Sequence, residues 1–286
     1  MSARGCWLFA LVSVLWGVVY AVIKVAVDAG LEPLFITWVR LVIAACVLLP
    51  LAWRVADIGA LRRRLGSLAL FALVEVVVPQ PLITAGEQRV SSSLTAILIA
   101  AAPLFVVLLA LRFDASERPS RRAFLGLVTG FVGVAVLVGV DVAGSGREAV
   151  GAAAILTAAF CYAVGPLIVK HRLRELDPRA SMGVSITLAA LAVTPALSFD
   201  LPTTTPPARA IAALAGLGLF CTAAAFSLYA ALIAEVGPAR ALVVTYLNPV
   251  VALAVGIALL GERLTAGGIG GLALILVGSW WATVRR

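Results

Sequence analysis

The chain has 286 residues, of which 63% are hydrophobic and 13% charged, and its mean hydropathy is +1.11. This composition lies far outside the range of soluble globular domains, so most of the surface is expected to face lipid. The formal net charge is +8, but the basic residues form short clusters between apolar runs and no single patch. We therefore expect the lipid bilayer as a partner and exclude nucleic acid.

Apolar runs follow one another along the whole chain, and a bilayer core of about 30 Å needs about 20 helical residues. They predict an all-α integral membrane protein with ten transmembrane helices. The expected helices lie near residues 6–27, 34–53, 66–84, 92–112, 122–140, 150–170, 180–199, 210–232, 239–260 and 267–284.

The basic residues of the loops fall mainly on one side of this ten-helix scheme. Apart from Lys24 and Arg40, which lie inside apolar runs, the exceptions are Arg89, Arg147, Arg209 and Arg263. Because Lys and Arg are retained in cytoplasmic loops, the pattern predicts a multi-pass protein of the cytoplasmic (inner) membrane with both termini in the cytoplasm.

Similar residues recur at one nearly constant spacing. The pairs Lys24 and Lys170, and Pro103 and Pro249, are 146 residues apart; Glu117 and Glu262, and Gly126 and Gly271, are 145 apart. The spacing predicts two repeats, residues 1–141 and 142–286. Each would hold five helices, an odd number, so the second would enter the membrane inverted. Inverted repeats around a central cavity are typical of secondary transporters.

The residues at these repeated positions resemble the drug/metabolite transporter superfamily, and in particular the EamA-type permeases. The resemblance is carried by Gly237-Pro238, Tyr246-Leu-Asn-Pro249 and Leu260-Gly-Glu-Arg-Leu-Thr265, with a weaker first-half counterpart in Ala101-Ala-Pro103 and Glu117. In the first half, Arg118-Pro119 replaces the Arg-Leu-Thr that follows Glu262. The resemblance covers nearly the whole chain and implies ten helices around a cavity and transport, often export, of small metabolites. It implies no particular substrate.

Charged residues inside the apolar runs are Lys24, Arg40 and Glu75. A charge at mid-bilayer costs about 2.5 to 3.5 kcal/mol on insertion scales, so each needs a partner, water or a function. Glu75 lies about 14 Å into its helix by helical rise, near the midplane. One hypothesis places Glu75 in the cavity, binding a cationic group or a coupling proton; the other pairs it with Arg40 or Lys24. Arg40 would bind an anionic group or snorkel outward, and Lys24 has the same two alternatives.

Prolines inside two apolar runs predict helix kinks, at Pro103 and at Pro249. Because Pro249 leaves the carbonyl of Thr245 without its helical donor, Tyr246 and Asn248 beside it are candidate ligand contacts. The other polar or aromatic candidates for the cavity lining are Trp16, Tyr20, Gln80 and Tyr162. Helix packing explains each of them as well.

The spacings Gly126-x-x-x-Gly130 and Gly267-x-x-x-Gly271 allow close approach of helices. They predict tight packing of the fifth and tenth helices inside the monomer, with a homodimer interface as the alternative.

Taken as a whole, the pattern predicts a secondary transporter that exports small metabolites or amino-acid-like solutes by alternating access. The alternatives are an exporter of cationic drugs coupled to protons through Glu75, and a non-transporting membrane scaffold. An enzyme is not expected, because the chain has one His and neither a Gly-x-Ser-x-Gly nor a His-Glu-x-x-His motif. No cofactor or metal is expected, since the four cysteines are dispersed in apolar runs.

Overall fold

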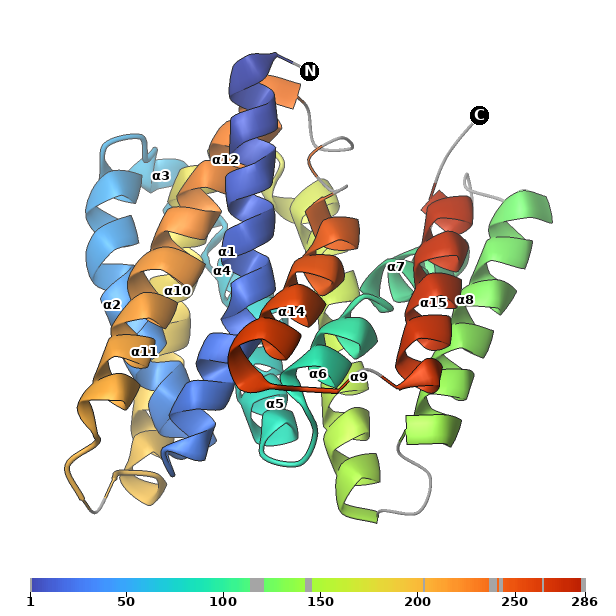
Figure 1. Ribbon diagram of the computed structural model, residues 1–286. Helices are drawn as coiled ribbons and strands as arrows, with labels where there is room; N and C mark the ends of the chain where they lie inside the picture. The colour runs from blue at the N-terminus through green and yellow to red at the C-terminus, as the bar shows by residue number, and fades with distance from the viewer. Residues whose placement is uncertain are drawn as a thin grey trace.

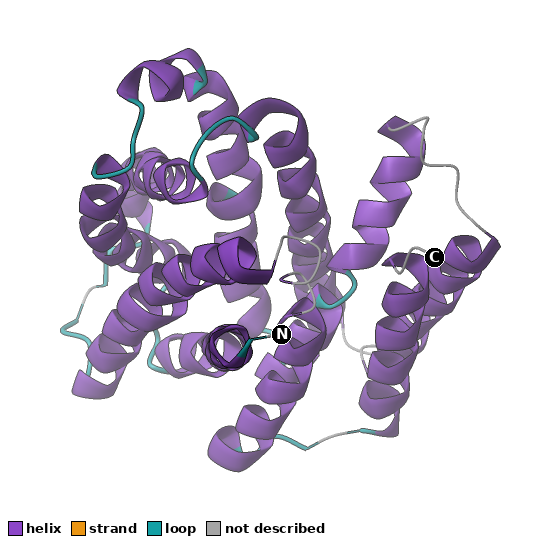
Figure 2. Cartoon of the chain, turned by 90° about the horizontal axis from the view of Figure 1, so that it is seen from above, coloured by secondary structure: helices purple, strands orange, loops and turns teal. Residues whose placement is uncertain are grey.

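The computed structural model describes residues 2–113, 121–141, 146–202, 204–236, 241, 244–263 and 265–283. Over these ranges the secondary structure is helical, without strands (Figure 2). The prediction of an all-α chain is confirmed for the described residues.

The helices follow the predicted segments closely. In the first half they are α1 (Ala3–Asp28), α2 (Pro33–Trp53), α3 (Ile58–Arg63), α4 (Leu65–Ala72), the π-helical turn η1 (Leu73–Val77), α5 (Pro79–Glu87), α6 (Ser92–Ile99), α7 (Ala102–Phe113) and α8 (Arg121–Asp141). In the second half they are α9 (Gly146–Ile168), the π-helical turn η2 (Val169–Leu173), α10 (Pro178–Val193), the 3-10 turn η3 (Thr194–Phe199), α11 (Ala208–Gly218), the π-helical turn η4 (Leu219–Ala224), α12 (Ala225–Val236), α14 (Val244–Leu260) and α15 (Ala266–Thr283).

Within the described residues, seven helical segments are long and apolar enough to cross a membrane, and three shorter helices are also apolar. The seven include composite segments such as Leu65–Glu87, in which α4, η1 and α5 follow one another. The shorter ones are Phe124–Gly139, Val244–Leu260 and Ala266–Trp281. The chain is therefore a multi-pass membrane protein.

Capping residues fix several helix starts. The hydroxyl of Ser2 accepts from the Gly5 amide at the start of α1, and Ser91 accepts from Leu94 N at 3.1 Å at the start of α6. Pro33 begins α2 and Pro178 begins α10, where the missing amide hydrogen costs no intrahelical bond.

The fourth predicted helix is interrupted, whereas the ninth continues through its proline. Ala100 and Ala101 separate α6 from α7, just before Pro103, which cannot donate to the Ile99 carbonyl. Pro249 lies inside α14, whose described part runs without a break from Val244 to Leu260.

Helices α8 and α15 pack side by side at one edge of the molecule (Figure 1). A Cβ atom added at Gly271 would lie 2.9 Å from the Leu137 Cβ and 3.1 Å from the Gly133 carbonyl oxygen. One added at Gly278 would meet the backbone of Gly126 and Gly130. The close approach predicted from the glycine spacing is therefore present inside one chain.

The remaining contacts interleave the two halves of the chain. Helix α1 packs against α14, α11 and α12, while α9 packs against α5, α6 and α7; α2 packs against α10. Helix α1 begins and α15 ends toward the same end of the molecule, the upper end in Figure 1. The opposite end carries the last turn of α1 and the end of α5.

Some residues of the predicted motifs lie outside the described ranges. They are Glu117, Arg118, Pro119, Gly237, Pro238 and Leu264.

Candidate functional site

Arg40 lies in α2 and is buried, with 9% of its surface exposed. Its Nε donates to the Thr222 hydroxyl at 2.6 Å, and that hydroxyl donates to the Leu217 carbonyl at 2.7 Å. Thr222 belongs to η4 in the other half of the chain, in a π turn of the kind often found at functional positions. Arg40 therefore points into the contact between α2 and η4, which lies between α11 and α12. The alternative in which the Arg40 side chain extends outward to water is wrong.

Glu75 lies in η1, the π turn of the third span, and is half-buried. Its Oε2 is buried without a hydrogen-bond partner and approaches Gly165 of α9, where an added Cβ would collide with it. The ion pairs recorded among the described residues join Lys24 to Asp28 and Arg64 to Glu175. The predicted alternative in which Glu75 pairs with Arg40 or Lys24 is therefore not found.

Aromatic side chains surround the region between Glu75 and Arg40. Tyr162 of α9 lies within electrostatic range of both, and Tyr20 of α1 is within range of Arg40 and Tyr162. The Trp16 ring packs on Tyr229 with centroids 4.8 Å apart, and on Phe226 at 5.6 Å. Tyr229 is also within electrostatic range of Glu75. Glu75 and Arg40 are thus related through Tyr162, which lies within electrostatic range of each. Tyr20 lies near Arg40, and Trp16 packs on Tyr229 near Glu75.

The remaining candidates are placed differently. Gln80 in α5 is 5% exposed, and its Oε1 atom is buried without a hydrogen-bond partner. The Oδ1 atom of Asn248 in α14 is also buried without a hydrogen-bond partner. The Tyr246 hydroxyl donates to the Ser279 carbonyl at 3.2 Å, so this side chain reaches α15. The backbone of Asn248 lies close to Gly17 of α1: a Cβ atom added at Gly17 would lie 3.1 Å from the Asn248 carbonyl oxygen.

Sequence reasoning missed Glu87, at the end of α5. Its side chain is fully buried, and neither carboxyl oxygen has a hydrogen-bond partner. Lys24 lies beside it: the ammonium donates to the Glu87 backbone carbonyl at 3.0 Å and pairs with Asp28 at 3.2 Å. The predicted third helix ended at residue 84, which left Glu87 in a loop beside Gln88 and Arg89. Lys24, a cation inside an apolar run that needs an anion, was the available signal.

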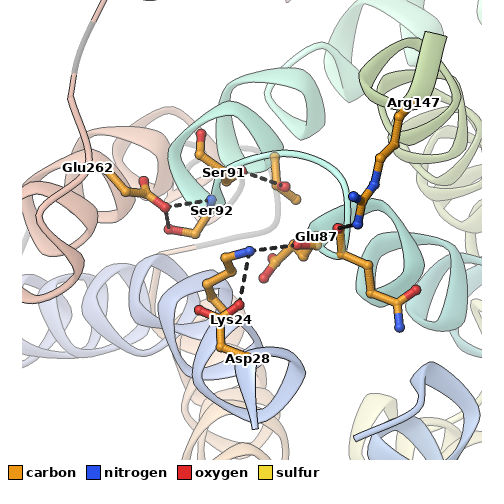
Figure 3. A network of polar contacts seen from close by, with 9 residues as sticks. Lys24, Asp28, Glu87, Ser91, Ser92, Arg147 and Glu262 are labelled. Carbon is orange, nitrogen blue, oxygen red and sulfur yellow. Dashed lines mark hydrogen bonds and ion pairs between the residues drawn. The ribbon is translucent and has the colours of Figure 1, made fainter. Parts of the chain in front are cut away.

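Glu262 ties the two halves together close to Lys24 and Glu87 (Figure 3). Its carboxylate accepts from the Ser92 amide at 2.8 Å, the Ser92 hydroxyl at 2.9 Å and the Ser93 amide at 3.0 Å, and from the Ser93 hydroxyl. Gly261, with φ of +65°, turns the chain after α14 so that Glu262 meets α6. A carboxylate at a helix N-terminus is stabilised by unpaired amides and by the helix dipole. The sequence motif around Glu262 therefore has a structural role.

Burial by itself would raise the pKa of Glu262, but the hydrogen bonds from Ser93 and Ser92 hold it below the ordinary value of 4.5. A carboxyl whose pKa is lowered by folding stabilises the protein above the unfolded-state pKa, and this contribution is lost as the pH falls through the folded-state pKa. We therefore expect the stability advantage of the native chain over Glu262→Gln to be full near neutral pH and to shrink below about pH 4.5. Thermal unfolding of both forms in detergent between neutral and acidic pH measures it. An advantage that grows on acidification would contradict the assignment.

Pockets flank both ends of the bundle. One, of about 380 Å³, is lined by Lys24, Val27, Asp28, Gln88, Arg89 and Arg147. The other, of about 230 Å³, is lined by Ala60, Arg63, Arg64, Glu175 and Leu176. The described residues hold no cluster of three or more His, Cys, Asp or Glu that could bind a metal ion.

Comparison with known proteins finds membrane transporters that are similar to this chain. The uncharacterized inner membrane transporter YedA of Escherichia coli K12 is 31% identical over 90% of this chain and 83% of its own length. A probable terminal-alkyne amino-acid exporter of Streptantibioticus cattleyicolor is 29% identical, over 96% of this chain and 93% of its own. A probable amino-acid metabolite efflux pump of Salmonella typhimurium is 26% identical, over 97% and 94%. A solved crystal structure with 15% identity aligns at a TM-score of 0.69 over 99% of this chain and 97% of its own, which shows a shared fold.

The fold and these relatives define a multi-pass inner-membrane transporter of small solutes. The model of the EamA-like transporter family matches residues 3–139 and again residues 149–284. The chain belongs to the EamA-like transporter family, as the resemblance at Pro249 and Glu262 predicted.

Proposed function

We propose that the protein is a secondary transporter that exports amino-acid-like solutes by alternating access, with Glu75 and Arg40 as opposite poles of its binding site. The observation that carries the proposal is the arrangement of these two charges. Glu75 and Arg40 lie on spans of the first half, in contact with spans of the second, and neither has the other as its ion-pair partner. A zwitterion offers an ammonium to Glu75 and a carboxylate to Arg40.

The surroundings of the two charges favour a solute of this kind. Tyr162 lies within electrostatic range of both, so this side chain relates the two poles. The Oε2 atom of Glu75 has no hydrogen-bond partner, which is costly for a buried polar group unless a ligand or a proton supplies one. Two relatives carry names that specify export of an amino acid or an amino-acid metabolite. These names support the same substrate class here.

The proposal includes the architecture that alternating access needs. Ten helices would form two inverted repeats, residues 1–141 and 142–286, with a central cavity between them and both termini cytoplasmic. The two family matches support the division. So do the π turns η1 and η4, because Leu73 and Leu219 begin them 146 residues apart. In this repeat, α1 corresponds to α9, and α6 with α7 corresponds to α14. The contact of α1 with α14 therefore has its counterpart in the contact of α9 with α6 and α7.

One observation favours a second function, proton-coupled export of cationic drugs through Glu75. Trp16, Phe226 and Tyr229 form an aromatic cluster, and Tyr229 lies within electrostatic range of Glu75. Aromatic faces beside a carboxylate attract organic cations. In that case Arg40 would have no part in binding.

Flux in reconstituted vesicles tests both functions. We expect vesicles that contain the native protein to move isotopically labelled L-amino acids, and Glu75→Gln and Arg40→Gln each to lower that flux by about tenfold or more, because each removes a charged hydrogen-bond partner. Tetraphenylphosphonium flux that requires Glu75 but tolerates Arg40→Gln would favour the second function. Undiminished amino-acid flux in Glu75→Gln would refute the site, and absence of flux for both probes would favour a scaffold.

A matched variant tests the position of Glu75 without removing it. The Cβ of Gly165→Ala would occupy the space of the Glu75 carboxyl oxygen, so the flexible glutamate has to move. We expect reduced flux in Gly165→Ala, and no further loss when the same change is made in Glu75→Ala, because coupled residues are non-additive. Gly216→Ala, where an added Cβ meets nothing within 4 Å, is the control.

A further inference from the structure

The carboxyl group of Glu87 is the most deeply buried charge-bearing group that the proposed transport site does not use. Its exposed fraction is 0%, and both oxygens lack a hydrogen-bond partner. An ionised carboxylate in such surroundings is unfavourable, because it has lost water and gained no donor. Glu87 therefore needs either a proton or a cation close at hand.

Lys24 is the nearby cation, but its ammonium forms an ion pair with Asp28 and not with the Glu87 carboxyl group. Its ammonium bonds the Glu87 backbone carbonyl at 3.0 Å and the Asp28 carboxylate at 3.2 Å. The Lys24 side chain is 23% exposed and that of Asp28 is 57% exposed. Because the ion pair with Asp28 is largely hydrated, it holds Lys24 only weakly. The Glu87 carboxyl group lies within electrostatic range of Lys24, and Figure 3 shows Lys24, Asp28 and Glu87 beside one another. A change of Lys24 rotamer is the movement that would exchange Asp28 for Glu87.

A pocket lies beside this cluster. Its volume is about 380 Å³, and it is lined by Lys24 and Asp28, and by Gln88 and Arg89, which directly follow Glu87. Lys24 and Asp28 thus border space large enough for water, next to the fully buried Glu87.

Charged and titratable groups face Glu87 from several elements. Tyr20, Lys24 and Asp28 come from α1, Arg40 from α2, and Glu262 from the segment after α14. From α9, Arg147 donates to the Gln88 carbonyl at 3.1 Å, next to Glu87 in the chain. Glu262 is already satisfied by Ser92 and Ser93. Lys24 is thus the cation that directly contacts the Glu87 residue.

We propose that Glu87 is a proton-binding site of the transport cycle, and that Lys24 switches between Asp28 and Glu87 as the proton leaves and returns. On release, the carboxyl O–H bond breaks and the proton passes to water in the pocket. The new carboxylate accepts a hydrogen bond from the Lys24 ammonium, and Asp28 remains ionised and hydrated. One positive charge leaves the protein in this step, and the reverse step restores it.

This inference rests on the proposed transport function for its place in a cycle. Glu87 is not one of the two proposed solute-binding residues, although Arg40 lies within electrostatic range of it. Both carboxyl groups of the third span take part: Glu75 in its middle and Glu87 at its end, twelve positions later. Proton exchange at Glu87 would break and remake contacts of Lys24 at the end of the molecule where Glu262 joins the halves.

Infrared spectroscopy of the protein in lipid vesicles tests the site without any solute. The carboxylic-acid C=O band is followed during a pH titration of the native protein, Glu87→Gln and the matched control Glu75→Gln. We expect one titrating component that is absent in Glu87→Gln and retained in Glu75→Gln. Persistence of every component in Glu87→Gln overturns the proposal.

Two further variants change the partner of Glu87 and keep the carboxyl itself. Lys24→Met removes the ammonium that stabilises the ionised form, so the component should persist to a pH higher by about one unit. Asp28→Asn frees Lys24 for Glu87, so the component should disappear at lower pH. Shifts in the same direction, or no shift in either variant, overturn the switch, and this comparison stands even if Glu87→Gln fails to fold.

The two hypotheses fail in distinguishable ways. Absence of solute flux with the Glu87 titration intact rejects the proposed transport function and leaves the proton site. Normal flux without a component assigned to Glu87 rejects the proton site alone.

Discussion

Replacing Gly278 by alanine is expected to destabilise the protein by about 2 to 3 kcal/mol, because the contact it blocks is between two backbones. A Cβ at this position of α15 would lie 2.6 Å from the Gly126 carbonyl oxygen and from the Gly130 Cα of α8. A backbone cannot rotate away as a side chain can, so the helices would have to separate along their shared face. The free energy of unfolding in mixed detergent and lipid measures the effect.

Gly270 gives the matched control on the same helix. An added Cβ there meets nothing within 4 Å, so Gly270→Ala removes a flexible residue from a helix without a collision. We expect the free energy of unfolding of Gly270→Ala to lie within about 1 kcal/mol of the native value. The higher helix propensity of alanine acts to make the variant the more stable of the two. Equal losses in Gly270→Ala and Gly278→Ala would show that the contact between α8 and α15 is looser than described.

Replacing Glu262 by alanine is expected to cost about 2 to 4 kcal/mol, because it removes the acceptor of charge-assisted hydrogen bonds at a helix N-terminus. The amides of Ser92 and Ser93 would be left without their acceptor, and the connection after α14 would lose its attachment to α6. Thermal unfolding at neutral pH in detergent measures the loss.

Glu175→Ala is the control for this change. Glu175 also accepts from a partner distant in sequence, Arg64 at 3.3 Å, but the side chains are 65% and 43% exposed. Exposed ion pairs contribute about 1 kcal/mol or less. A loss in Glu262→Ala no greater than that in Glu175→Ala would refute the role of Glu262 as a structural anchor.

Most of the helical segments were predictable, because membrane spans depend on long apolar runs that hydropathy reads directly. That Glu75 lies inside the third of these segments, Leu65–Glu87, also followed from the extent of its apolar run. The segments α8 and α15 were predicted to pack together because small residues at a spacing of four leave a characteristic pattern. Each of these features depends on composition or on local spacing.

The partners of the buried charges were not predictable in the same way. The hydroxyl that binds Arg40 belongs to Thr222, which is distant in sequence and unremarkable in an apolar run. For Tyr246 the sequence left ligand contact and helix packing as alternatives, and the bond from its hydroxyl to the Ser279 carbonyl of α15 depends on a residue 33 positions away. Glu87 was missed because α5 continues beyond the apolar run that marks it. Such contacts depend on tertiary packing, which periodicity along one helix does not report.

The π turn η1 has a consequence for the face that each part of the third span presents. A π turn places one more residue in a turn than an α-helix does, and each α-helical residue advances the direction of side chains by about 100°. Side chains of α5 therefore point about a quarter-turn or more away from where an uninterrupted α-helix would aim them. The span thus consists of two segments of different helical phase, with Glu75 at the change and Glu87 in the second. Hydrophobic periodicity measured across the whole span would mix these phases, so the faces of α4 and α5 have to be assigned separately.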